Sequence, residues 1–179
     1  MNGSGVARRS LTYRVKWQTV RWALLVLGTM FEKTARRCPE LQAEIADWEE
    51  GRTISMGVLP RGPYISLRKE AGLIRYLGQG LRNADLEIFF KNLDCAILPL
   101  TAQIGNDAAF NQHRAIAYGD IGHAIQAARA LQIVQTYLLP GFLLRRHLKR
   151  APQLTGKQKW LKARLQAALG LSVLANMLK

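Results

Sequence analysis

Residues 53–69 read TISMGVLPRGPYISLRK, and this stretch decides the fold. Apolar and polar side chains alternate over 53–59 and again over 64–69, with a proline- and glycine-rich segment at 60–63 between the two runs. Alternation with a period of two predicts strands that are buried on one face. Proline and glycine between them predict a turn. We therefore expect two neighbouring strands in this part of the chain.

The pattern extends in both directions along the chain. Further strands are predicted over 73–77, 84–90 and 115–118, at a spacing that suits an antiparallel meander. Helical spacing of apolar residues predicts helices over 40–50, 93–104, 108–112 and 121–139. Asp120 is placed to cap the last of these helices. The sequence predicts an α+β fold with a five-stranded, mostly antiparallel sheet covered by helices on one face.

Charge is distributed unevenly along the 179 residues, whose net charge is +14. Residues 1–37 carry eight Lys and Arg against one acid, and residues 121–179 carry ten against none. The middle of the chain is nearly neutral by comparison. An excess of this size predicts an anionic partner, such as a membrane surface or a nucleic acid.

Both basic ends are also rich in apolar residues. The run at 22–31 is about half the length that a membrane-spanning helix needs, and no signal-peptide cleavage site follows it. We expect amphipathic helices at 1–39 and 141–179 that flank a domain at 40–140. These helices either pack on the domain or lie in the interface of an anionic membrane. The second alternative predicts a cytoplasmic, peripherally membrane-associated protein.

The sequence contains no recognisable catalytic or metal-binding motif. His113, His123 and His147 have no metal-ligand spacing with one another or with Cys38 and Cys95. The chain contains no Walker lysine motif and no Gly-x-Ser-x-Gly motif. We therefore expect that the protein is not an enzyme and that it has no cofactor and no metal site. Outward positions of the predicted sheet offer no aromatic stacking platform, which weighs against nucleic-acid binding.

Two motifs stand in an informative order. ADLEIFF at 84–90 precedes a predicted helix, and DAAFNQHRAIAYGD at 107–120 leads from a short helix through a strand into a long helix. In this order they resemble the sterol carrier protein 2 family, in which an aspartate-led strand is followed by a helix. That family also has an alanine-phenylalanine helix that leads to a short strand ending in Gly-Asp. The resemblance covers roughly residues 40–140.

The resemblance implies a five-stranded sheet and helices that enclose an apolar cavity or tunnel. Members of the family bind sterols, fatty acyl chains, phospholipids or other hydrophobic molecules. Some bacterial members are accessory proteins in ubiquinone biosynthesis. By resemblance, we expect non-enzymatic binding of an acyl, phospholipid or isoprenoid quinone precursor lipid, and its presentation or transfer at a membrane surface.

Inward positions of the sheet and its helices are the candidates for the lipid-binding lining: Ile88, Phe90, Ile97, Leu100, Ile104, Phe110, Ile116, Ile125, Leu131 and Val134. Residues of the two basic ends are the candidates for membrane contact: Trp17, Arg21, Trp22, Arg145, Arg146, Lys149, Trp160 and Lys162. Each lining candidate is also what an ordinary solid core would contain. That alternative predicts a scaffolding subunit whose basic ends bind an anionic membrane or a membrane or biosynthetic protein complex.

Overall fold

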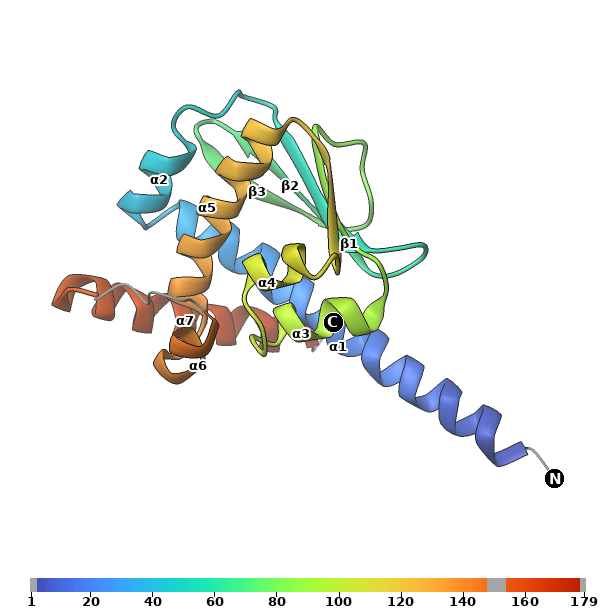
Figure 1. Cartoon of the computed structure of the whole chain (residues 1–179). Coiled ribbons are helices and arrows are strands. Elements are labelled where there is room, and N and C mark those ends of the chain that lie inside the picture. The colour runs from blue at the N-terminus through green and yellow to red at the C-terminus, as the bar shows by residue number, and fades with distance from the viewer. Residues whose placement is uncertain (1–2, 148–153, 178–179) are drawn as a thin grey trace.

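The computed structural model describes residues 3–147 and 154–177, with side chains over 11–144 and 154–170. Its elements follow the order of the predicted pattern (Figure 1). The helices are α1 (Gly3–Ala35), α2 (Pro39–Ile45), α3 (Leu93–Leu100), α4 (Asn106–Asn111), α5 (Ile121–Leu138), α6 (Gly141–His147) and α7 (Gly156–Met177). The strands are β1 (Thr53–Val58), β2 (Tyr64–Glu70), β3 (Leu73–Gln79), β4 (Leu86–Phe90) and β5 (Ala115–Gly119).

The five strands form one sheet in the order β3-β2-β1-β4-β5. Three of the pairs are antiparallel, and β1 runs parallel to β4. The predicted α+β fold with a mostly antiparallel sheet is therefore confirmed. The predicted meander is wrong, because a meander would place β4 beside β3 rather than beside β1.

Residues 80–85 explain this change of neighbour. Ser55 and Ser66 form a hydrogen bond across β1 and β2, with their Oγ atoms 2.8 Å apart. The Ser55 Oγ also lies 3.1 Å from the carbonyl oxygen of Arg82, and the Ser66 Oγ lies 3.1 Å from that of Gly80. Because each hydroxyl has a single hydrogen, one serine donates to the other, which in turn donates to its carbonyl oxygen. These bonds hold the segment against β1 and β2, so the chain returns past both strands before it enters β4.

The buried face of the sheet is the one that the alternating pattern predicts. Met56 lies opposite Ile65 on β2 and opposite Ile88 on β4, and all three side chains are buried. Because successive strand residues point to opposite faces, the apolar set of each strand lies on the same side of the sheet. The helices pack on this side and form one core with it.

Helix α1 is part of that core rather than an appendage to it. Leu24 and Met30 are fully buried, and α1 packs on β3 and β2. Gly28 allows the close approach, since a Cβ atom there would lie 2.6 Å from Cε2 of Tyr76. The boundary expected between the helical segment 1–39 and the domain 40–140 therefore falls inside a single hydrophobic core. Over residues 3–147 and 154–177, no helix is both long and apolar enough to cross a bilayer.

Helix α7 packs on α1 and α5 through the fully buried Leu165. Its polar side chains bond to the last carbonyl groups of α5, which have no partner within that helix. The Lys162 ammonium donates to the carbonyl oxygen of Thr136 at 2.8 Å. The Gln166 amide donates to the carbonyl oxygens of Tyr137 and Leu138 at 3.3 and 3.2 Å. The C-terminal helix thus closes the end of α5.

Candidate functional site

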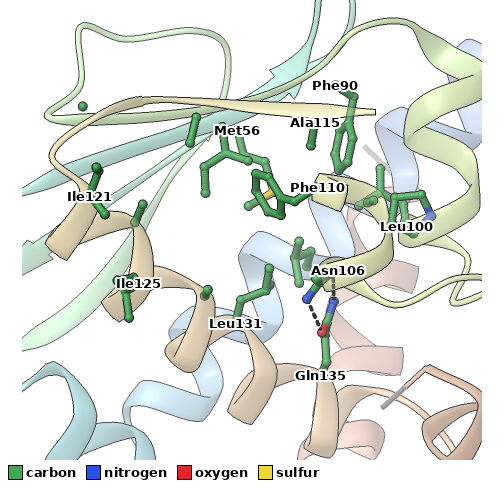
Figure 2. A pocket seen from close by; sticks show the side chains of 18 residues that line it. Met56, Phe90, Leu100, Asn106, Phe110, Ala115, Ile121, Ile125, Leu131 and Gln135 are labelled. Carbon is green, nitrogen blue, oxygen red and sulfur yellow. Dashed lines mark hydrogen bonds between the residues drawn. The ribbon is translucent and has the colours of Figure 1, made fainter. Parts of the chain in front are cut away.

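An apolar pocket lies between the helix-covered face of the sheet and α5, and it has a volume of about 300 Å³. Figure 2 shows its walls: Met56 and Phe90 from the sheet, Phe110 from α4, and Ile121, Ile125 and Leu131 along α5. A well-packed interior leaves few voids larger than a water molecule. In size and chemistry the pocket therefore suits a small apolar ligand.

Small residues on facing elements create this space. β5 contributes Ala115, Ala117 and Gly119 to the wall, and α5 contributes Ala124 and Ala128. Gly119 has φ +127, and a Cβ atom there would lie 2.4 Å from the carbonyl oxygen of Asp85. Helix α5 packs on α1, α2 and α7 but makes few contacts with β5. The pocket is the gap that remains between them.

The mouth of the pocket is rimmed by exposed apolar side chains. Ile121 is 77% exposed, Ile125 is 53% exposed and Phe110 is 37% exposed. Asp120 caps α5 by accepting a hydrogen bond from the backbone N–H of His123 at 3.0 Å, which fixes the start of the helix at this rim. The rim continues the apolar lining outward to the solvent.

The opposite end of the pocket holds its polar residues. The amide nitrogen of Asn106 donates to Gln135 Oε1 at 2.8 Å, and the amide nitrogen of Gln135 donates to Asn106 Oδ1 at 3.2 Å (Figure 2). Among the described residues that line the pocket, none is charged. The site is chemically suited to hold an apolar molecule, and no described lining residue could act as a general acid, general base or nucleophile.

The predicted lining residues divide into two groups. Six of the ten line the pocket: Ile88, Phe90, Leu100, Phe110, Ile125 and Leu131. The pocket does not include Ile97, Ile104, Ile116 and Val134. Val134 is fully buried in the core, while Ile116 lies on the face of β5 opposite to that of Ala115 and Ala117 because strand residues alternate. Contact of any of these residues with a lipid stays a prediction.

Sequence reasoning missed the alanines of the wall. Ala115 and Ala117 alternate along β5, and Ala124 and Ala128 are four residues apart on α5. Each spacing places the two alanines of a pair on one face of their element. This pattern could have been noticed, but a small residue in a sequence does not show whether a neighbour fills the space beside it.

The predicted membrane contacts at the N-terminal end have partners within the chain. Trp17 and Trp22 are half-buried. The Arg21 Nε donates to Gln79 Oε1 at 2.9 Å, and its guanidinium lies 5.9 Å from the ring centroid of Trp17. Arg21 and Trp17 are therefore held by contacts within the fold, and contact of these residues with a membrane stays a prediction.

The predicted contacts at the C-terminal end differ from one another. Trp160 is exposed, with the Arg164 guanidinium 4.5 Å from its ring centroid. The Lys162 ammonium donates its hydrogen bond to the carbonyl oxygen of Thr136 on α5, and burial lowers the pKa of Lys162. Arg145 and Arg146 belong to α6, but their side chains lie outside the described part of the chain, as does the whole of Lys149.

Two larger hollows are open at the surface. One, of about 690 Å³, lies beside the turn at 59–62 and includes the ion-paired Lys16 and Asp94. The other, of about 740 Å³, lies between α2 and the start of α7 and includes Glu40. In residues 3–147 and 154–177, no three His, Cys, Asp or Glu side chains are grouped so that they could hold a metal ion. The smaller apolar pocket is the candidate site because both larger hollows include charged side chains.

No family model matches the chain, and no curated protein matches its sequence. Solved structures do show similarity. One, described as "UbiJ-SCP2 Ubiquinone synthesis protein", is 13% identical, covers 63% of this chain and 90% of its own, and gives a TM-score of 0.43. The sterol carrier protein domain 2 of Helicoverpa armigera is 15% identical over 60% of this chain and 84% of its own, with a TM-score of 0.42.

Sterol carrier protein 2 of Yarrowia lipolytica, in its apo form, is 14% identical over 69% of this chain and 90% of its own, with a TM-score of 0.40. These structures carry the name of the family that residues 84–120 resemble. At such low sequence identities, the similarity concerns the fold alone. In fold, the chain is similar to sterol carrier protein 2 domains.

Proposed function

We propose that this protein binds a hydrophobic lipid in the pocket between β5 and α5 and presents or transfers it at a membrane surface, without catalysis. The observation that carries this proposal is the pocket itself, which has apolar walls, a volume of about 300 Å³ and an open apolar mouth. The sequence resemblance supports an acyl chain, a phospholipid or an isoprenoid quinone precursor as the ligand.

The physical reason for binding is the transfer of an apolar chain out of water. Each methylene group that enters such a pocket contributes about 0.8 kcal/mol. The walls belong to helices and strands that pack into one core, so little of this free energy is spent on ordering the protein. The exposed Ile121 and Ile125 extend the apolar surface to the mouth, where a chain would enter or leave.

Helix α1 supplies the feature that supports action at a membrane. Residues 3–16, the N-terminal arm, extend outward from the fold, which the inner end of the arm contacts through the Lys16–Asp94 ion pair (Figure 1). On this arm Leu11 is 64% exposed and Val15 is 58% exposed, and they are four residues apart on one side of the helix. Arg8, Arg9 and Arg14 lie beside them in the sequence, and the arm contains no acid. Basic and apolar residues on a projecting helix suit the interface of an anionic bilayer.

The pocket is tested by filling its mouth. Ala128 lines the pocket and is exposed, so Ala128→Phe introduces a ring at the opening without crowding the buried core. We expect this variant to take up a fluorescent acyl lipid from donor vesicles about tenfold more weakly than the unmodified protein, because the ring occupies the volume that the chain needs. Fluorescence of the transferred lipid measures the uptake.

Gln132→Phe is the matched control. Gln132 is exposed on the same helix, one turn further on, and does not line the pocket. We expect it to leave uptake within about twofold of the unmodified level, because the new ring lies outside the pocket. The ring adds the same apolar surface as in Ala128→Phe, so the comparison separates filling of the pocket from a change in surface hydrophobicity. Equal uptake by both variants and the unmodified chain would place the lipid elsewhere. Absence of uptake by the unmodified chain would favour a scaffolding role.

A further inference from the structure

The Asn106–Gln135 pair is the polar end of an otherwise apolar pocket. The two amides face each other between α4 and α5 and exchange hydrogen bonds of 2.8 and 3.2 Å (Figure 2). Gln135 is only 7% exposed, whereas Asn106 is half-buried. Two polar side chains at the inner end of a lipid-sized cavity need a physical reason, because apolar residues would line it equally well.

The pair keeps hydrogen-bonding capacity that the fold does not use. Each side-chain amide has two N–H donors and an oxygen with two lone pairs. In the pair each amide donates once and accepts once, and neither side chain makes another hydrogen bond within residues 3–147 and 154–177. One N–H group and one lone pair on each residue are therefore unused by the fold, and both residues line the pocket.

We propose that the Asn106–Gln135 pair selects a lipid with an uncharged hydrogen-bonding group, such as a hydroxyl or a carbonyl, and holds that group at the inner end of the pocket. This inference rests on the proposed function. An amide pair offers both a donor and an acceptor, so it satisfies a hydroxyl or a carbonyl equally well. The apolar part of the ligand then runs along Leu131 and Ile125 to the mouth.

The same geometry excludes a charged group from the inner end. The described lining contains no Lys, Arg, His, Asp or Glu that could compensate a carboxylate, phosphate or ammonium. An ion without a partner loses its hydration on burial, at a cost that a neutral amide does not offset. A lipid with a charged head therefore leaves the head at the mouth and places only its chain inside.

The test compares three ligands that share one chain: dodecane, dodecanol and dodecanoate. Their affinities for the full-length protein are measured by displacement of a pocket-bound anilinonaphthalene dye, before and after the double substitution Asn106→Leu with Gln135→Leu. Replacing both partners of a buried hydrogen bond with apolar groups of similar shape is nearly neutral for folding. A thermal melt verifies that the double variant is folded.

We expect the double variant to bind dodecanol about fivefold to tenfold more weakly than the unmodified protein. Its affinities for dodecane and dodecanoate should stay within about twofold, because neither places a polar group at the pair. Leu131→Met, a change of similar volume one turn away on α5, is the control and should affect all three ligands alike.

An equal change for dodecanol and dodecane would overturn the inference and leave the pair as a structural link between α4 and α5. That outcome would leave the proposed function intact, since chains would still bind. Absence of binding of all three ligands to the unmodified protein would contradict the proposed function itself, and with it the inference.

Discussion

Glu40 connects three helices through a single carboxylate. Its Oε2 accepts hydrogen bonds from the Cys38 thiol at 2.8 Å and the Tyr137 hydroxyl at 3.3 Å, while its Oε1 accepts one from the Gln158 amide at 2.6 Å. Tyr137 belongs to α5 and Gln158 to α7, so the carboxylate joins both helices to the start of α2. The hydrogen bond from Cys38 is the main reason that the pKa of Glu40 lies below its usual range, and burial opposes it.

This network predicts a pH-dependent contribution to stability. A carboxylate whose folded-state pKa is lowered stabilises the fold above its unfolded pKa, and this contribution is lost as pH falls through the folded-state value. We expect Glu40→Gln to reduce the free energy of unfolding at neutral pH by about 1 kcal/mol or less, since Glu40 is exposed. The variant should lose less stability on acidification than the unmodified protein.

Urea denaturation at neutral pH and at pH values below the usual range of a glutamate measures both effects. Glu49→Gln is the control, because Glu49 is an exposed carboxylate on the same acidic stretch. Identical acid profiles for Glu40→Gln and the unmodified protein would show that the carboxylate does not hold the three helices together.

The strands were the elements most accessible to sequence reasoning. Each is a run of five to seven residues, and the alternation of apolar and polar residues over 53–59 and 64–69 predicts which side chains of β1 and β2 join the core under the helices. The pairing of β4 with β1 could not be predicted in this way. It depends on the hydrogen bonds of Ser55 and Ser66 to residues 80–85, which are contacts between distant parts of the chain.

Helix α5 shows why only part of the pocket could be predicted. Its sequence predicts one apolar stripe that includes Ile121, Ile125, Leu131 and Val134. In the structure Val134 packs into the core, whereas the other three line the pocket. A hydrophobic pattern indicates which residues avoid water but does not distinguish packing against a neighbour from facing an empty volume.

The N-terminal arm carries a prediction of its own. Leu11→Glu places a negative charge on the exposed apolar side of the arm, so we expect it to weaken binding to anionic vesicles about tenfold at low salt. Binding by the unmodified protein should decrease as salt is raised, because the arginines of the arm act through screened charges. Co-sedimentation with vesicles measures both.

Leu81→Glu is the matched control for the arm. Leu81 is also exposed, at 51%, but lies in the segment 80–85 rather than on α1. Leu81→Glu changes the net charge by the same amount as Leu11→Glu. It should weaken vesicle binding much less, because the new charge does not lie on the arm. Equal losses in the two variants would assign membrane binding to the overall charge of the protein rather than to the arm.

On the scale of the whole molecule, the pocket is assembled from parts that are far apart in the sequence. Leu27 of α1, Met56 of β1, Phe90 of β4, Phe110 of α4 and Gln135 of α5 all line it. The family resemblance led us to expect a cavity, and composition indicated an anionic partner. Where the cavity opens, and which residues close its inner end, follow only from the packing of these elements.

The most direct test of the central claim is native mass spectrometry of the protein purified without detergent, followed by solvent extraction and identification of any bound lipid. We predict a mass increase that corresponds to one lipid per chain, removed by extraction and restored when lipid vesicles are offered. A bare protein mass that stays unchanged after incubation with acyl, phospholipid and isoprenoid vesicles would contradict lipid binding in the pocket.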